Sequence, residues 1–183
     1  LYLYDNDLTG EIPSEIGNLV NLSGSGFNLN DNDLTGEIPS EIGNLTSLSS
    51  LRLSNNQLNG IHPNIMNMQN LTSIYLQGNQ FNEIPTGIGN LTHLTHLDFS
   101  YNQISIIQSE IENLVNMYNL NLSGNLLSGE IPSEIGNLVN LTELHLTDND
   151  LSGEIPPEIG NLTSLTSLKF YRNYLTGGIP PEI

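Results

Sequence analysis

The 183-residue sequence contains no cysteine and no tryptophan, and it has only three basic residues: Arg52, Lys169 and Arg172. Without cysteine, the chain cannot form a disulfide framework, a thiolate metal site or a cysteine nucleophile. Three basic residues cannot build the positive surface that releases counterions from nucleic-acid phosphates, so we expect no nucleic-acid partner. Against these three stand 20 acidic residues, which give a formal net charge of −17 at pH 7.

Long apolar runs are also missing. No stretch approaches the roughly 20 apolar residues that span a bilayer, so we predict no membrane contact within this segment. No basic stretch followed by an apolar one opens the chain, so no signal peptide is visible in the segment. The apolar share of 37% is nevertheless sufficient, at this length, for one domain with a sizeable core.

One sequence segment recurs along the chain. Residues 5–19 read DNDLTGEIPSEIGNL, residues 31–45 repeat the same fifteen residues, and shorter versions return at 127–138 and 151–162. Eight apolar residues mark equivalent positions, with spacings of 26, 24, 23, 23, 23, 24 and 24 residues: Leu8, Leu34, Leu58, Phe81, Ile104, Leu127, Leu151 and Leu175. A period in this range is typical of a solenoid with one structural coil per repeat.

Each repeat contains the same succession of local signals. A short alternating stretch, such as Leu51-Arg52-Leu53, predicts a strand with its leucines directed inward. An asparagine follows in every coil, and stacked copies can satisfy buried turn backbone with both amide donors and a carbonyl acceptor. These asparagines are Asn6, Asn32, Asn56, Asn79, Asn102, Asn125, Asn149 and Asn173. The Gly and Ile-Pro that come next favour extended or 3-10 return segments over regular helix.

The pattern LxxLxLxxNxLxGxIPxxIGNL resembles the plant-type leucine-rich repeats of receptor-like kinase ectodomains and some bacterial surface proteins. The resemblance implies a curved solenoid with a parallel sheet on its concave face and a short second strand near Gly-x-Ile-Pro. It also implies an extracellular or cell-surface location. We therefore predict a leucine-rich repeat solenoid of about eight coils of 23–26 residues, with irregular or 3-10 return segments.

Some positions depart from the pattern. The repeats marked by Phe81 and Ile104 lack the glycine, and Gln108 replaces the proline, so we expect less regular coils in the middle. Two extra residues within 23–26 predict a small bulge in the second coil. The chain starts and stops inside a repeat, without the cysteine-paired caps of plant receptor ectodomains. We expect residues 1–183 to be a single solenoid and a fragment of a longer protein.

The outward-facing strand positions hold the candidate binding residues. All three basic residues lie in these columns, and all seven tyrosines lie in them or directly beside them. The alternative explanation is that core and turn chemistry leave unusual residues no other place. Tyrosine and arginine are enriched at binding hot spots, so we predict a non-catalytic module that binds a protein or peptide ligand on the concave face. Such a module would belong to a receptor-like or secreted protein and would need no cofactor.

Two patches are predicted to carry the binding. The middle patch comprises Tyr75, Asp98 and Tyr101, and the C-terminal patch comprises His145, Lys169, Tyr171 and Arg172. Arg52 completes the set of ligand-binding candidates. We also expect Arg172 to pair with Asp148 on the neighbouring coil.

Two chemical alternatives are weaker. His96, Asp98 and Ser100 alternate along one strand, but Asp98 stands in the middle, where a catalytic histidine would have to be. The chain is therefore not expected to be an enzyme. Weak cation binding would require the carboxylates of Asp5, Asp7, Asp31 and Asp33 to converge from adjacent coils.

Ice binding or a structural, adhesive role is a further alternative, because regular polar ladders on solenoids serve such functions. The ladder would comprise Thr9, Thr35, Asn59, Asn82, Ser105, Ser128, Ser152 and Thr176. Its mixed composition and its uneven repeat spacing make this interpretation less favoured than ligand recognition.

Overall fold

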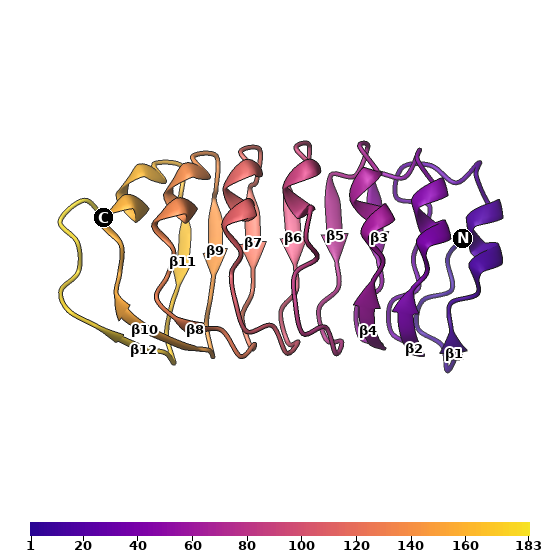
Figure 1. Cartoon of the computed structure of the whole chain (residues 1–183), viewed down its shortest axis with the longest axis horizontal. Helices are drawn as coiled ribbons and strands as arrows, with labels where there is room; N and C mark the ends of the chain where they lie inside the picture. Colours follow the sequence, from indigo (N-terminus) through magenta and orange to yellow (C-terminus); the bar gives the residue numbers. More distant parts are fainter.

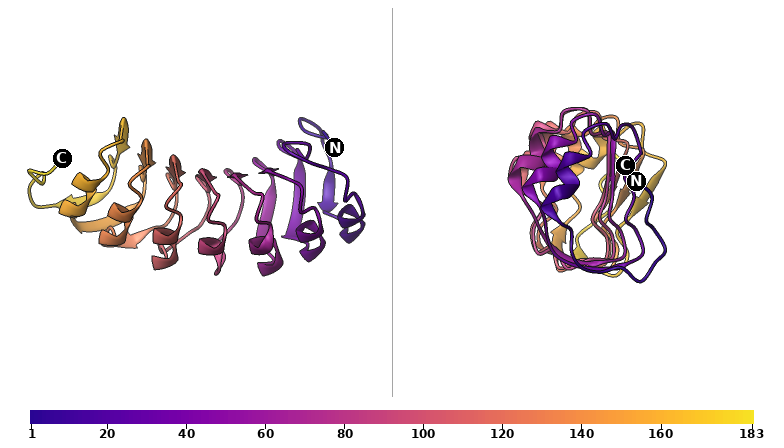
Figure 2. Two further views of the ribbon diagram at one scale, coloured as in Figure 1. Left: turned by 90° about the horizontal axis from the view of Figure 1, so that it is seen from above. Right: turned by 90° about the vertical axis from the view of Figure 1, so that its right-hand side faces the viewer.

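Short parallel strands alternate with short 3-10 helices along the whole chain in the computed structural model, which describes residues 1–183. Successive coils stack into an arc whose inner side is lined by strands and whose outer side carries the 3-10 helices (Figures 1 and 2). Seen end-on in Figure 2, the coils superimpose closely, as expected from one repeated local structure. None of the helices has the length and apolar character needed to cross a bilayer.

A six-stranded parallel sheet forms the concave face, in the order β11-β9-β7-β6-β5-β3. Its strands are β3 (Ser50–Arg52), β5 (Ser73–Tyr75), β6 (His96–Asp98), β7 (Asn119–Asn121), β9 (Glu143–His145) and β11 (Ser167–Lys169). Each strand pairs in register with the next, and isolated bridges from Tyr2 to Asn28 and from Asn28 to Arg52 continue the array through the first two coils. The predicted concave sheet and its outward column are therefore confirmed.

The second strands form two separate three-stranded sheets. One contains β1 (Thr9–Glu11), β2 (Asp33–Ile38) and β4 (Gln57–Ile61), and the other contains β8 (Ser128–Gly129), β10 (Asp150–Glu154) and β12 (Tyr174–Thr176). No second strand forms in the coils marked by Phe81 and Ile104, which confirms their predicted irregularity. In that gap the side chain of Gln108 donates an N–H to the Ile84 carbonyl at 2.9 Å.

Seven 3-10 helices occupy the return path, where proline was expected to prevent regular helix. They are η1 (Ser14–Asn18), η2 (Ser40–Asn44), η3 (Pro63–Asn67), η4 (Ile88–Asn90), η5 (Ser109–Asn113), η6 (Ser133–Asn137) and η7 (Pro157–Asn161). An extended proline precedes most of them. Before η3, His62 takes this place, and its Nδ1 accepts the Asn64 N–H at 3.2 Å. His62 thus replaces the usual proline with a side-chain cap.

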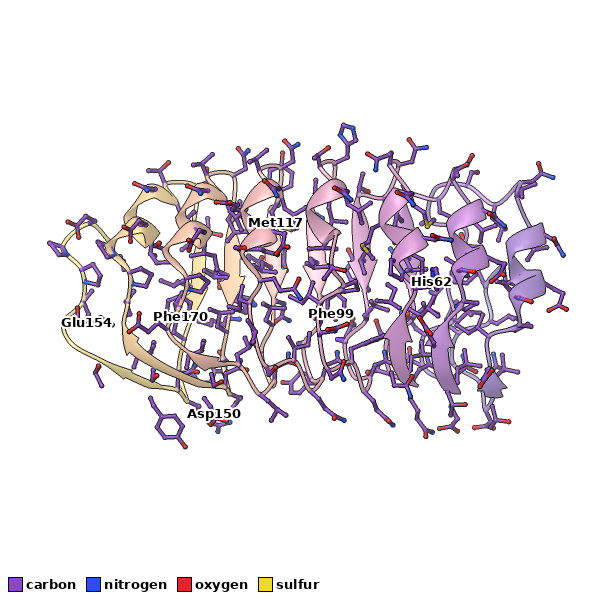
Figure 3. All side chains as sticks on the ribbon, in the orientation of Figure 1. His62, Phe99, Met117, Asp150, Glu154 and Phe170 are labelled. Atoms are coloured by element: carbon purple, nitrogen blue, oxygen red, sulfur yellow. The ribbon has the colours of Figure 1, made fainter.

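The space between the sheet and the outer layer is filled by one cluster of 41 buried apolar residues. Phe99 and Met117, labelled in Figure 3, belong to it, and the rings of Phe81 and Phe99 meet edge to face at 5.6 Å. The asparagine ladder runs beside this core. Asn56 donates to the carbonyls of Leu29 and Leu53, and its Oδ1 accepts the Leu34 N–H. The six inner asparagines are buried, and the predicted ladder is confirmed.

At the predicted bulge in the second coil, the chain makes a tight turn. The Gly26 N–H donates to the Ser23 carbonyl at 3.0 Å, and Gly24 pairs with Leu48 of the next coil. The two additional residues are therefore absorbed locally, and the strand positions that follow keep their register.

Candidate ligand-binding surface

Where each concave strand leads into its turn, one residue adopts the left-handed backbone conformation. Eight residues share it, with φ between 52° and 67°: Asp5, Asp31, Asn55, Gly78, Tyr101, Gly124, Asp148 and Arg172. Asp, Asn and Gly tolerate this conformation, but a bulkier residue costs about 1–2 kcal/mol. Tyr101 and Arg172 are therefore the unusual members of the column. The repeat pattern did not predict the conformation.

Tyr101 lies over the backbone of the neighbouring coil. A Cβ added to Gly124 would lie 2.6 Å from Cδ1 of the Tyr101 ring, so the ring occupies the place of a side chain at residue 124. The residue remains 66% exposed. Backbone strain of this kind is concentrated at functional sites, where the surrounding structure holds it. Gly124 is thus a supporting residue that sequence reasoning missed.

A small hollow of about 170 Å³ opens on the concave face beside Tyr101. Its lining residues are Tyr101, Asn121, Ser123, His145, Thr147, Asp148, Lys169 and Tyr171. Four of the eight predicted residues therefore meet here. The structure groups Tyr101 with the C-terminal patch, whereas the sequence had grouped it with Tyr75 and Asp98. We call this hollow the concave pocket.

The sequence did not predict that Tyr101 lines the same hollow as the C-terminal patch, because the columns were treated as straight, whereas the side chain of this left-handed residue extends onto the next coil. The polar lining from Asn121, Ser123, Thr147 and Asp148 was also missed. Their positions within the outward columns were the only available signal.

Charge in the concave pocket is unevenly balanced. Burial, together with the positive charge of Lys169, lowers the pKa of His145, and this effect outweighs the opposing influence of Glu143 and Asp98. His145 is therefore neutral at pH 7, and its Nε2 lies 2.9 Å from the Ser167 hydroxyl. No carboxylate oxygen lies within 4.0 Å of the Lys169 ammonium.

Arg172, by contrast, is already paired. Its Nη1 donates to Oδ1 of Asp148 at 3.1 Å, as the sequence predicted, and this hydrogen bond raises the pKa of the guanidinium. The negative charge of Asp148 balances the positive charge of Arg172. Lys169 therefore provides the unpaired positive charge of the concave pocket.

The remaining predicted residues lie on the strands toward the N-terminal end of the sheet. Arg52 stacks over the Tyr75 ring with its Cζ 5.4 Å from the ring centroid, and its Nε donates to the Ser50 hydroxyl at 3.2 Å. Such cation–π pairs hold the guanidinium flat while leaving its outer edge free.

Asp98 lies next to Tyr75 in the strand register, but its oxygens are already engaged. Oδ1 accepts both the N–H and the hydroxyl of Ser100, at 2.9 and 2.6 Å, and Oδ2 accepts an amide N–H of Asn121 at 3.2 Å. Asp98 thus orders its neighbours.

The catalytic alternative on this strand is not supported by the side-chain contacts. The Ser100 hydroxyl donates to Asp98, whereas His96 Nδ1 lies 2.9 Å from the Thr95 hydroxyl. Ser100 and His96 therefore do not form a nucleophile–base pair.

The structure does not support the weaker alternative of a cation site. No group of three or more His, Cys, Asp or Glu side chains in the chain could hold a metal ion. Asp31 instead accepts an amide N–H of Asn55 at 2.7 Å, and Asp33 accepts one from Gln57 at 3.1 Å. Stacking of the coils thus pairs Asp31 and Asp33 with amides on the next coil.

The polar ladder expected for ice binding is not supported by the strand register. Thr35 pairs with Glu11 on one side and with Gln57 on the other, because neighbouring second strands are staggered by two residues. The ladder is also interrupted in the middle, where no second strand forms. A regular array of hydroxyl groups is therefore absent from this face.

A strand, an asparagine-lined turn and a 3-10 return, repeated along the chain, define a class of curved solenoid proteins. The profile of a leucine-rich repeat region matches residues 1–123, and a leucine-rich repeat profile matches residues 116–138 and 140–162. The chain belongs to the leucine-rich repeat family. No curated protein sequence matches it.

Solved structures of the same fold come from plants and bacteria. The plant peptide hormone receptor RGFR1, in complex with RGF2, is 41% identical with a TM-score of 0.91 over 97% of this chain. The Arabidopsis receptor kinase HAESA, in complex with the peptide hormone IDA and the co-receptor SERK1, is 42% identical with a TM-score of 0.89 over 98%. A Leptospira interrogans leucine-rich repeat protein is 36% identical with a TM-score of 0.88 over 99%. This chain spans 29%, 30% and 44% of these structures, respectively.

Proposed function

We propose that this chain is a non-catalytic recognition segment of an extracellular or cell-surface protein, and that it binds a peptide or an extended protein segment along its concave sheet. The observation that carries the proposal is the concave pocket, which gathers Tyr101, Tyr171, His145 and Lys169 from three coils. The resemblance to receptors solved with peptide hormones supports the same class of ligand.

Preorganisation supports the proposal energetically. Tyr101 is held against Gly124, and Arg52 is held against Tyr75, before any ligand arrives. Ordering a flexible side chain on binding costs about 0.5–1.5 kcal/mol, and side chains that are already held avoid part of that cost. Tyrosine adds a large contact area and a hydroxyl group that can bond to a peptide backbone.

Charge indicates which ligand group enters the concave pocket. Lys169 has no carboxylate partner in a chain with a net charge of −17, whereas Arg172 is paired with Asp148. An acidic group of the ligand would therefore meet Lys169. The surrounding negative charge would repel acidic ligands elsewhere on the surface, which adds specificity to the position.

Selection of binders from a random peptide library, followed by affinity measurements on variants, tests this proposal. Tyr75→Ala and Lys169→Glu should each lower the affinity for the selected peptides about tenfold or more, as expected for hot-spot residues. The Lys169 change should also reduce the salt dependence of association. Glu134→Gln, on the return side, is the control and should leave affinity unchanged. Peptides that tolerate both concave changes but lose affinity after return-side substitutions would refute the proposal.

A further inference from the structure

A second hollow lies outside the concave pocket, on the edge formed by the loops that lead from η3, η4 and η5 into β5, β6 and β7 (upper edge of Figure 1). We call it the edge groove. Its volume is about 470 Å³, and two columns of side chains line it: Asn70, His93 and Asn116, and then Thr72, Thr95 and Tyr118. The groove has neither a carboxylate nor a lysine or arginine, although the chain is strongly acidic.

The first column is mainly structural. The Nδ2 of Asn70 donates to the Thr46 carbonyl at 2.7 Å, and that of Asn116 donates to the Thr92 carbonyl at 2.8 Å. Asn140 continues the pattern beyond the groove. Each amide thus ties its coil to the preceding one. His93 interrupts the column: it is exposed, and its ring makes no hydrogen bond.

The second column is also structural and is interrupted one coil later. The hydroxyl groups of Thr72, Thr95 and Thr142 each donate to a carbonyl of the preceding coil, at 3.1, 2.8 and 2.8 Å. Tyr118 stands where the next threonine would be. Its hydroxyl has no partner, it is 48% exposed, and the His96 ring packs nearly perpendicular to its own with 6.5 Å between ring centroids.

His93 and Tyr118, the two exceptions, therefore line the same groove. His93 and Tyr118 each lack the coil-to-coil hydrogen bond that the members on either side of them in their column make, and they present an unpaired imidazole and a phenol ring instead. The His96 contact restricts the Tyr118 ring, which favours a flat partner. Amide oxygens of Asn70 and Asn116 remain available as acceptors, because only their N–H groups are used internally.

We propose that the edge groove binds a neutral saccharide, with a sugar ring stacked on Tyr118 and its hydroxyl groups bonded to His93 and the asparagine oxygens. An uncharged ligand with many hydroxyl groups fits a lining of amides, hydroxyls, imidazole and one aromatic ring. A mainly apolar ligand would leave these polar groups unsatisfied. An anionic ligand would find no positive side chain in the groove and would be repelled by the acidic surface. The site is independent of the peptide-binding proposal.

Backbone amide NMR shifts during titration with cellotetraose, chitotetraose and maltotetraose test the proposal. At least one of these neutral oligosaccharides should shift amides within residues 69–72, 92–96 and 115–119 while leaving those of the concave pocket unchanged. Tyr118→Thr and His93→Asn restore the side-chain types of their columns, so both variants should fold. Each should weaken saccharide binding about fivefold or more, in line with the loss of one stacking or hydrogen-bonding contact.

Tyr75→Ala serves as the matched control, since it removes an aromatic ring from the concave sheet and should leave saccharide affinity unchanged. Three outcomes would overturn the proposal. The first is that none of the three oligosaccharides shifts the groove amides. The second is that the shifts centre on the concave pocket. The third is that Tyr118→Thr binds saccharide as tightly as the parent chain while retaining its thermal stability. The first and third outcomes leave the peptide-binding proposal unaffected, because that proposal depends on other residues.

Discussion

Replacing Asn102 with leucine should destabilise the solenoid at its centre. Asn102 donates N–H groups to the carbonyls of Leu76, Phe99 and Ser100, at 3.0, 3.0 and 3.2 Å, and its Oδ1 accepts the Phe81 N–H at 3.0 Å. Leucine has a similar volume but can make none of these four bonds. The residue is 8% exposed, so water cannot readily replace them.

The four lost bonds are not equivalent. All three carbonyls keep another donor: the amides of Asn79 and Asn125 reach Leu76 and Phe99, and the Gly78 N–H reaches Ser100. The Phe81 N–H has no second partner. A buried donor without a partner costs about 1–3 kcal/mol, and losing the three shared bonds adds a smaller amount. We therefore expect a total loss of about 2–4 kcal/mol.

Urea unfolding followed by circular dichroism measures this loss, with Asn6→Leu as the matched control. Asn6 occupies the equivalent position in the first coil, but it is exposed and makes only two bonds, to the Leu3 and Tyr4 carbonyls. Its replacement should cost less than about 1 kcal/mol. Equal midpoints for the Asn102 variant and the parent chain would refute the assignment of Asn102 as the partner of buried turn backbone.

Two further predictions concern the concave pocket. Gly124→Ala and Gly129→Ala both place a Cβ on a left-handed backbone, but only the former meets a ring, that of Tyr101, at 2.6 Å. Thermal unfolding should therefore show Gly124→Ala to be about 1–3 kcal/mol less stable than Gly129→Ala, and equal stability would mean that the ring moves freely. Because the pKa of His145 is lowered on folding, the unfolded chain binds its proton first, so stability falls as pH decreases below about 6.5. His145→Gln should make the stability curve between about pH 7.5 and 5.5 flatter than that of the parent chain, and parallel curves would contradict the assigned shift.

The regular parts of the fold could be predicted because the sequence of each coil contains the local signals that determine its structure. Alternating leucines place Leu51 and Leu53 inward in any strand, and the Ile-Pro segment excludes regular helix wherever it occurs. The missing glycines and Gln108 indicated that the middle coils would be less regular. Local chemistry repeated eight times leaves one consistent arrangement, namely stacked coils with a buried asparagine ladder.

The candidate sites were harder to predict because they depend on contacts between coils. The contact of Tyr101 with the C-terminal patch was not predicted, because neither its left-handed backbone nor the space above Gly124 is visible in the sequence. The aspartates do not form a cation site, and two of them, Asp31 and Asp33, accept hydrogen bonds from amides on the next coil. His93 and Tyr118 were not candidate binding residues, since their importance appears only where neighbouring coils exchange hydrogen bonds.

The sequence alone determined the repeating coil, the concave sheet, the asparagine ladder and the face on which tyrosine and basic residues gather, because these follow from local periodicity and turn chemistry. The tertiary structure decided which of these residues share a pocket, which charges are already paired and where a second groove opens. Those properties depend on side-chain direction and on distances between residues more than twenty positions apart, and both are set only when the coils stack.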